Sequence, residues 1–220
     1  MRLDEFESVF RSAIKPTYEL RRPPLREIVV LTDEAPEPAY KLITQARAIL
    51  SDADTPVAPD FRLLSAHDRT ADSVLSELLT SSIDLLVTHR HVLSHWRNTP
   101  YALGSAMSIF VQTLPCPVLM LPLLPANAPA HSRDKAPETA LVATRHLIDD
   151  SDLVDWALHV TGDDGTVVLG HVEDESQSRR YLDAIGRIRG IDTDIALTRL
   201  PDKLLQLSRD YTDSVVEQMQ

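Results

Sequence analysis

Residues 83–122 read IDLLVTHRHVLSHWRNTPYALGSAMSIFVQTLPCPVLMLP. Ile83–Thr88 and Pro117–Pro122 are apolar runs of strand length, and residues 101–114 between them have the spacing of a helix. Near-continuous apolar strands that alternate with helices imply a parallel sheet covered on both faces. This stretch therefore predicts the closing part of an α/β domain.

The chain before residue 83 repeats the same alternation. Two more apolar runs predict strands at Arg26–Thr32 and Phe61–Ala66, and helical spacing predicts helices over residues 37–50 and 70–79. We therefore expect residues 1–123 to form an α/β domain with an open parallel sheet, a Rossmann-like sandwich. An additional helix is predicted at its N-terminus, ended by Pro23-Pro24, from an apolar face made by Leu3, Phe6, Phe10 and Ile14.

The chain after residue 123 predicts a second, shorter unit. Residues 124–139 are rich in Pro and Ala without periodicity, which is typical of a linker. In residues 140–220 a strand, a helix and a strand repeat the rhythm of the first unit, so we expect a tandem repeat whose second copy is incomplete. The expected elements there are strands over 140–147 and 166–174, helices over 150–160, 177–190 and 202–220, and a weak strand or loop over 191–198.

Composition excludes several classes of function. The chain of 220 residues has 22 Lys and Arg against 33 Asp and Glu, a formal net charge of −11. A surface of that sign repels phosphate backbones and anionic membranes, so we expect neither a nucleic-acid nor a membrane partner. The first of only six glycines is Gly104, so residues 1–103 contain neither a Walker loop nor a G-x-G-x-x-G turn.

Cysteine usage and the chain start predict the compartment. The single cysteine, Cys116, excludes an internal disulfide. No signal-peptide pattern opens the sequence, and no apolar run approaches the roughly 18 residues of a membrane span. We therefore expect a soluble cytoplasmic protein. Because Cys116 starts a strand expected to be buried, we expect its thiol pKa to be raised and its role to be packing.

The same residues carry a resemblance to a known family. Ile83–Pro122, with its Asp-Leu-Leu-Val strand, Gly104-Ser105 at the helix entry and Pro-Cys-Pro-Val-Leu strand, resembles the closing part of universal stress protein domains. The resemblance implies an adenine nucleotide alpha hydrolase-like fold, in which Asp33 matches an acidic residue over the ligand cleft. It also implies dimers built partly through the closing strand, Pro117–Pro122.

The chain departs from the family's ATP motif, G-x2-G-x9-G-[ST]. Its first two glycines correspond to Thr88 and His91, whose Cβ atoms would intrude where phosphate oxygens lie, and the spacing from His91 to Gly104 is longer than the motif allows. In the second unit, Arg145 replaces the strand-end acid and the Gly-Ser helix is absent. The resemblance therefore implies weak or altered binding of ATP or AMP at most.

The loop after the strand at Ile83–Thr88 holds the first group of candidate ligand residues. Thr88, His89 and Arg90 lie where open α/β sheets place their ligands. Arg90 and Arg97 could hold an anion, and His89, His91 and His95 could supply imidazoles to a metal, although no closed ligand set identifies one. The loop could equally be a solvated connection without a ligand.

Two further positions have two interpretations each. Asp33, preceded by Thr32, could contact an adenine or ribose, or could cap the helix that begins near Pro36. Gly104-Ser105 could present helix N–H groups to an anion, or Gly104 could be required only by close packing of that helix on the sheet.

These observations favour a noncatalytic regulator or adaptor of universal stress type. We expect it to self-associate through Pro117–Pro122, because an apolar edge strand requires a cover, and to act on a protein partner that the sequence does not identify. The alternative is a small-molecule sensor that binds an adenine nucleotide or another anionic metabolite between Asp33, Thr88–Arg90 and Gly104-Ser105. No residue pattern predicts a catalytic group.

Overall fold

A computed structural model describes residues 17–23, 25–50, 58–94, 101–123, 136–145, 147–148, 150–172, 176, 180 and 193–219, and within 193–204 only the backbone. The chain divides into two compact units. The first, called the four-stranded unit here, comprises Pro23–Glu138 and His159–Gly162. The second, called the two-stranded unit, comprises Met1–Arg22, Thr139–Leu158 and Asp163–Gln220.

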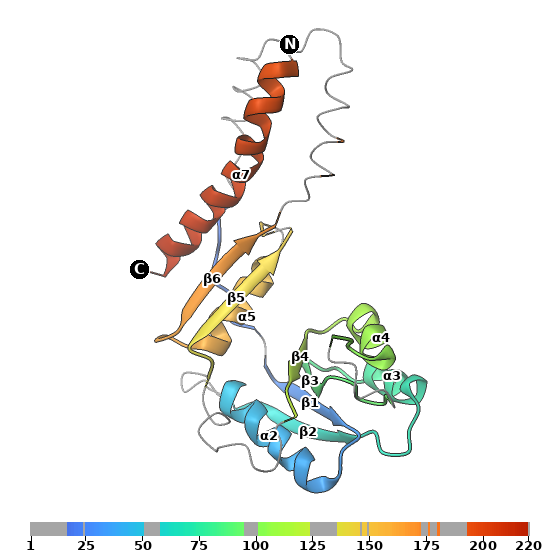
Figure 1. Cartoon of the computed structure of the whole chain (residues 1–220). Coiled ribbons are helices and arrows are strands. Elements are labelled where there is room, and N and C mark those ends of the chain that lie inside the picture. The colour runs from blue at the N-terminus through green and yellow to red at the C-terminus, as the bar shows by residue number, and fades with distance from the viewer. Residues whose placement is uncertain are drawn as a thin grey trace. The chain divides into compact units, whose positions relative to one another are not determined.

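The four-stranded unit is built on a parallel sheet with the strand order β2-β1-β3-β4 (Figure 1). Each strand is a short apolar run, and β1 and β3 are the most deeply buried because they occupy the centre of the sheet. Val30 pairs with Val87 across this centre, so the carboxyl ends of β1 and β3 lie side by side. The strands are β1 (Glu27–Thr32), β2 (Asp60–Ser65), β3 (Leu85–His89) and β4 (Val118–Leu121).

Helices cover both faces of this sheet (Figure 1). Val29 and Leu31 of β1 face a core shared with α3 (Ala71–Thr80) and α4 (Ser105–Thr113). The alternate residues Ile28 and Val30 are fully buried on the opposite face, where α2 (Pro36–Leu50) contacts β1 and β2. The unit is therefore an open, Rossmann-like α/β sandwich, as the sequence predicts.

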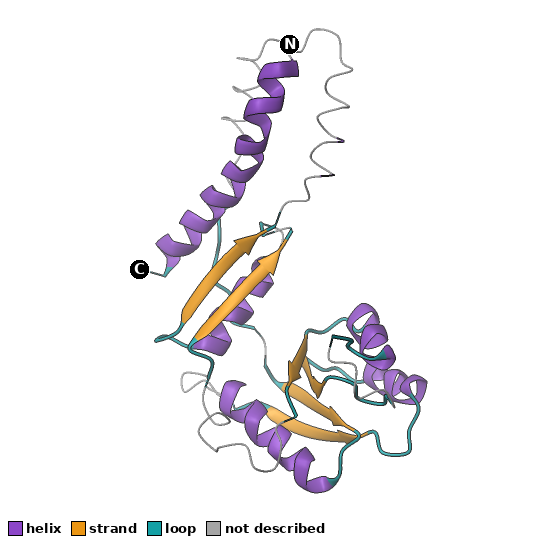
Figure 2. Cartoon of the chain, viewed as in Figure 1, coloured by secondary structure: helices purple, strands orange, loops and turns teal. Residues whose placement is uncertain are grey.

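The two-stranded unit pairs two parallel strands, β5 (Thr139–Thr144) and β6 (Thr166–His171), joined through α5 (Ser151–Thr161). α7 (Thr193–Gln218) is a single long helix (Figure 2). Their common core is apolar and includes Val142, Val154 and Val215. The strand, helix and strand of this unit confirm the rhythm expected from the sequence.

Two tyrosines complete that core. The rings of Tyr18 and Tyr211 meet edge to face with their centroids 6.1 Å apart, and each residue is 1% exposed. The Tyr18 hydroxyl donates a hydrogen bond to Asp155, and the Tyr211 hydroxyl lies 2.8 Å from that of Ser151. Both tyrosine hydroxyls therefore have a hydrogen-bond partner, as buried tyrosines usually do.

The structure differs from the sequence expectations in three places. Residues 193–198, expected as a weak strand or loop, begin the helix α7. Thr139, expected as the last residue of the linker, is instead the first residue of β5. Residues 17–22 were expected to join the first unit, but they belong to the two-stranded unit, where Tyr18 packs against Tyr211 in the core. The expected helices over residues 3–14 and 177–190 fall on parts of the chain that the structure does not describe, apart from Arg180.

None of the described helices combines the length and the apolar composition that crossing a membrane requires.

Candidate functional site

The candidate site lies at the carboxyl ends of β1 and β3. The chain leaves β1 through α2 to reach β2 on one side of β1, whereas β3 lies on its other side. Such a reversal of strand order opens a crevice at the strand ends, which is where open α/β sheets bind ligands. The residues that follow these two strands therefore meet at the position most suited to a ligand.

Three of the predicted residues converge there. His89, the last residue of β3, is 1% exposed, and its Nε2 lies 3.1 Å from Thr32 Oγ1 and 3.2 Å from Asp33 Oδ1. The Nδ1 of the same ring lies 3.0 Å from the carbonyl oxygen of Arg90. The imidazole is thus held at both nitrogens, in a fixed orientation between the two strands.

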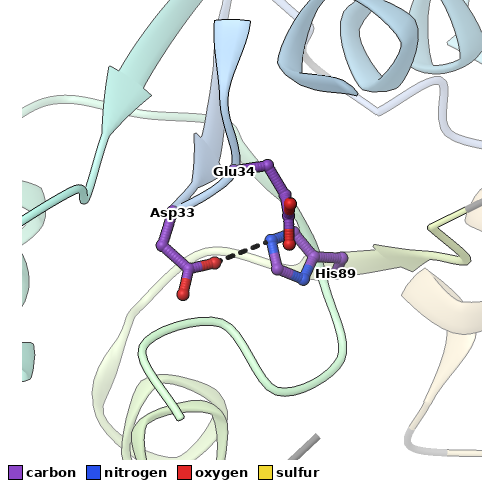
Figure 3. A group of neighbouring side chains, drawn as sticks. All are labelled: Asp33, Glu34 and His89. Atoms are coloured by element: carbon purple, nitrogen blue, oxygen red, sulfur yellow. Dashed lines mark ion pairs between the residues drawn. The ribbon is translucent and has the colours of Figure 1, made fainter. Parts of the chain in front are cut away.

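Glu34 joins this group, although the sequence analysis did not single it out. One ligand atom each from Asp33, Glu34 and His89 lie within 4.8 Å of one another, and Figure 3 shows both carboxylates turned toward the imidazole. The backbone N–H of Glu34 donates to Thr32 Oγ1, which fixes the chain where it leaves β1. Two consecutive acidic residues directly after a buried strand were the signal in the sequence that could have identified Glu34.

Asp33 also holds the loop that follows β3. Its Oδ2 accepts a hydrogen bond from the backbone N–H of Leu93, at 3.1 Å. Sequence reasoning offered a ligand contact or a helix cap for Asp33, and it missed this tie to a residue 60 positions away. The carboxylate therefore organises the site in addition to any contact it makes with a ligand.

The loop uses a backbone conformation that glycine favours. His91 and Leu93 have φ values of 65° and 56°. These lie in the left-handed region, which residues other than Gly, Asn and Asp rarely adopt. The loop therefore holds His91 and Leu93 in a backbone conformation that glycine adopts more easily.

Gly104 precedes α4 and lies against this loop. Its φ of 93° and ψ of 151° are open essentially only to glycine. A Cβ on Gly104 would lie 3.2 Å from the Cα of His91 and 3.5 Å from its Nδ1. Gly104 therefore packs closely against the loop after β3, whereas the sequence suggested close packing on the sheet, and the imidazole of His91 lies beside the start of α4.

One ring nitrogen of His91 has no hydrogen-bond partner within the described structure. The residue is 8% exposed, and its Nδ1 is among the buried side-chain atoms of the described residues that have no hydrogen-bond partner. Burial of a ring nitrogen without a partner is unfavourable and calls for a ligand or a water at that point. No acidic residue lies in the first turn of α4 to take this role.

A surface pocket of about 650 Å³ opens beside these residues. Its polar part consists of His89, Arg90 and His91, and its apolar part comes from Leu103 and the end of β4. Pockets of this size, largely apolar with a few convergent polar groups, are typical of small-molecule sites. The full lining comprises His89, Arg90, His91, Leu103, Met120, Leu121, Pro122 and Leu123.

The other predicted residues take different positions. Thr88 is fully buried, and the alternation of side chains along β3 places it on the opposite face of the sheet from His89. Ser105 is exposed at the first position of α4. Cys116 is half-buried, and burial raises its thiol pKa, which confirms the expected direction. His95 and Arg97 lie outside the described residues.

No protein-family model, curated protein or solved structure matches this chain. The features of this chain that bear on function are therefore the residues at the ends of β1 and β3, the loop after β3 and the pocket. Chemically, this arrangement offers a cationic and apolar pocket next to a compact group of one imidazole and two carboxylates.

Proposed function

We propose that this chain is a noncatalytic regulator of universal stress type, whose four-stranded unit binds a small anionic metabolite in the pocket at the ends of β3 and β4. The observation that carries the proposal is the Nδ1 of His91, buried without a hydrogen-bond partner among the described residues at a pocket that Arg90 also lines. An imidazole that carries a proton on Nδ1 can donate a hydrogen bond to an anion.

The start of α4, which follows the pocket residue Leu103 and Gly104 in the chain, is a second support for an anion. Gly104 leaves the N-terminus of α4 without a capping side chain, and the first turn of that helix carries no acid. Backbone N–H groups and the helix dipole at such a terminus attract negative charge. Arg90 is exposed at the pocket and adds a planar group suited to phosphate or carboxylate.

An adenine nucleotide is the ligand class that we put first. The strand order β2-β1-β3-β4 and the position of Asp33 after β1 agree with the resemblance to universal stress proteins. The side chain of His91 replaces a glycine of the resembled motif, so we expect nucleotide binding to be weak or altered. Regulation by ligand binding requires no bond to be made or broken at this site.

The test is a thermal-shift titration of the full chain with ATP, ADP, AMP and inorganic phosphate, each with and without magnesium. A ligand at 100 times its dissociation constant adds about 2.7 kcal/mol of stability. His91→Gly removes the imidazole without straining the positive φ, and we expect it to lose the shift. The exposed His67 supplies the matched control, His67→Ala. Absence of a shift at millimolar concentrations of every anion contradicts the proposal.

A second function, self-association, is supported by β4. This strand forms one edge of the four-stranded sheet, and Met120 and Leu123 are 38% and 40% exposed at and just after it. An edge strand with exposed apolar side chains is a template for pairing with another chain. We therefore propose a homo-oligomer in which β4 contributes to the interface.

A further inference from the structure

We propose that Asp33, Glu34 and His89 form a binding site for one divalent transition-metal ion of the class that zinc represents. The proposal is independent of whether an anion binds in the neighbouring pocket. Its first support is position: one ligand atom from each residue lies within 4.8 Å of the other two, close enough for a single ion to reach all three (Figure 3).

The hydrogen bonds of His89 give independent support. Its Nδ1 lies 3.0 Å from the Arg90 carbonyl oxygen, which can only accept, so Nδ1 carries the proton of the neutral ring. The lone pair is then on Nε2, the nitrogen that faces Asp33. Histidine ligands in metal sites are oriented in the same way, by donating the second ring N–H to a backbone carbonyl or a carboxylate.

A cation would bind two acceptor atoms that face each other at this site. Asp33 Oδ1 lies 3.2 Å from Nε2, and an ionised carboxylate and a ring lone pair are both acceptors. The Thr32 hydroxyl or a second ring proton can satisfy Nε2, whereas a cation can bind Nε2 and Oδ1 at once. The nearby carboxylate of Glu34 adds a second negative charge, which a divalent ion neutralises more completely than one proton does.

The donor set indicates the class of ion. One imidazole nitrogen with two carboxylates suits zinc, manganese, iron or cobalt, whereas calcium and magnesium prefer oxygen ligands alone. Thr32 Oγ1, 3.1 Å from Nε2 and bonded to the Glu34 N–H, positions both ends of the set. Asp33 and Glu34 are only partly buried and His89 lines the pocket, so an ion has a path of entry.

The experiment titrates the full chain, first freed of metal by a chelator, with Zn²⁺ in the presence of a competing chelator, and measures affinity, stoichiometry and thermal shift. We expect one ion per chain at this site. Glu34→Gln keeps the contact between Asp33 and His89 and should weaken Zn²⁺ binding at least about 10-fold, with no change in the melting temperature of the metal-free protein. His89→Ala is unsuitable as the main variant, because its buried ring supports the fold.

The matched control is His67→Ala, since His67 and Asp68 form another His–Asp pair, 3.5 Å apart, in which both side chains are largely exposed. Binding that is absent in the wild type, unchanged in Glu34→Gln or equally reduced in His67→Ala overturns the proposal. Co²⁺ gives a second readout: nitrogen and oxygen ligands give visible bands without thiolate charge transfer. A thiolate band would place the ion at Cys116 and would equally overturn the assignment.

Discussion

The hydroxyl of Tyr18 donates a hydrogen bond to the carboxylate of Asp155, joining two residues that lie 137 positions apart in the chain. The same carboxylate oxygen accepts the backbone N–H of Arg21, at 3.1 Å. Tyr18 is 1% exposed and Asp155 is 4% exposed, so these bonds are shielded from water. They fasten the segment before β1 to α5, within the two-stranded unit.

Tyr18→Phe should therefore destabilise the two-stranded unit by about 1.5–3 kcal/mol, the range for a hydrogen bond to a charged group. Asp155 would keep the Arg21 bond but lose its hydroxyl donor. The chain has two tryptophans, and in a Trp96→Phe background the fluorescence of Trp156, on α5, reports urea unfolding of this unit.

Tyr40→Phe is the control for that measurement. Tyr40 is 65% exposed on α2, so its change should lie within about 0.5 kcal/mol of zero. Equal unfolding free energies for Tyr18→Phe and the wild type would show that the buried bond adds no net stability.

Alkaline pH should weaken the same unit. Burial, with the hydrogen bond to Asp155, raises the pKa of Tyr18, and burial also raises the pKa of Tyr211. A raised folded pKa means that this stability is complete below pH about 10, the ordinary tyrosine value, and declines as the pH rises above it. A tyrosine that ionises in the unfolded chain and stays protonated in the folded one contributes a slope of about 1.4 kcal/mol per pH unit.

The measurement is the unfolding free energy of the two-stranded unit between pH about 9 and 12. Tyr18→Phe should make the slope smaller, because one of the two buried tyrosines no longer ionises in the unfolded chain. Tyr101→Phe, at a residue that is 99% exposed, should leave the slope as it is in the wild type. A slope that Tyr18→Phe does not change would contradict this account.

The fold of the four-stranded unit was predictable because its signals are local. The apolar runs that form β1, β2, β3 and β4 stand out in the sequence, and the observed bounds differ from the expected ones by one or two residues. α4 begins at Ser105 instead of residue 101, because Gly104 has a φ of 93° that no helix contains. Residues 193–198, expected as a weak strand or loop, belong to the helix α7, because a short stretch without a clear pattern follows the longer helix that contains it.

The candidate site was predictable only in part because its contacts are long-range. That Asp33 and His89 follow neighbouring strands could be inferred from the topology. The bond from Leu93 to Asp33 and the place of His91 beside Gly104 depend on positive φ values, which nothing in the sequence of that loop indicates. The sequence shows that residue 34 is a glutamate, but its place in the site becomes clear only in the fold, where β3 brings His89 next to it.

The two glycines of the four-stranded unit with positive φ should respond differently to a methyl group. Gly104→Ala forces alanine into a conformation that costs about 1–3 kcal/mol and also brings its Cβ to 3.2 Å from the Cα of His91. At Gly162, which has a φ of 65°, an added Cβ would have no neighbour within 4 Å. Gly162→Ala should therefore lower the stability only through the left-handed backbone conformation, by about 1–2 kcal/mol.

Thermal melting of the full chain, with and without the anion identified by titration, tests both effects. We expect Gly104→Ala to lower the melting temperature more than Gly162→Ala does and to weaken anion binding, because His91 must move. Equal losses of stability with anion binding intact in both variants would show that the approach of Gly104 to His91 is not tight.

A charge on the β4 edge should disrupt self-association. Met120→Lys places an ammonium group on an exposed position of the edge strand, and lysine on an edge opposes strand pairing between chains. Light scattering after size exclusion should then show a smaller species than the wild type forms. Leu79→Lys is the matched control, because Leu79 is 49% exposed on α3, away from that edge. A wild-type chain that is monomeric at all concentrations, or an oligomer that Leu79→Lys disrupts and Met120→Lys does not, would place any interface elsewhere than β4.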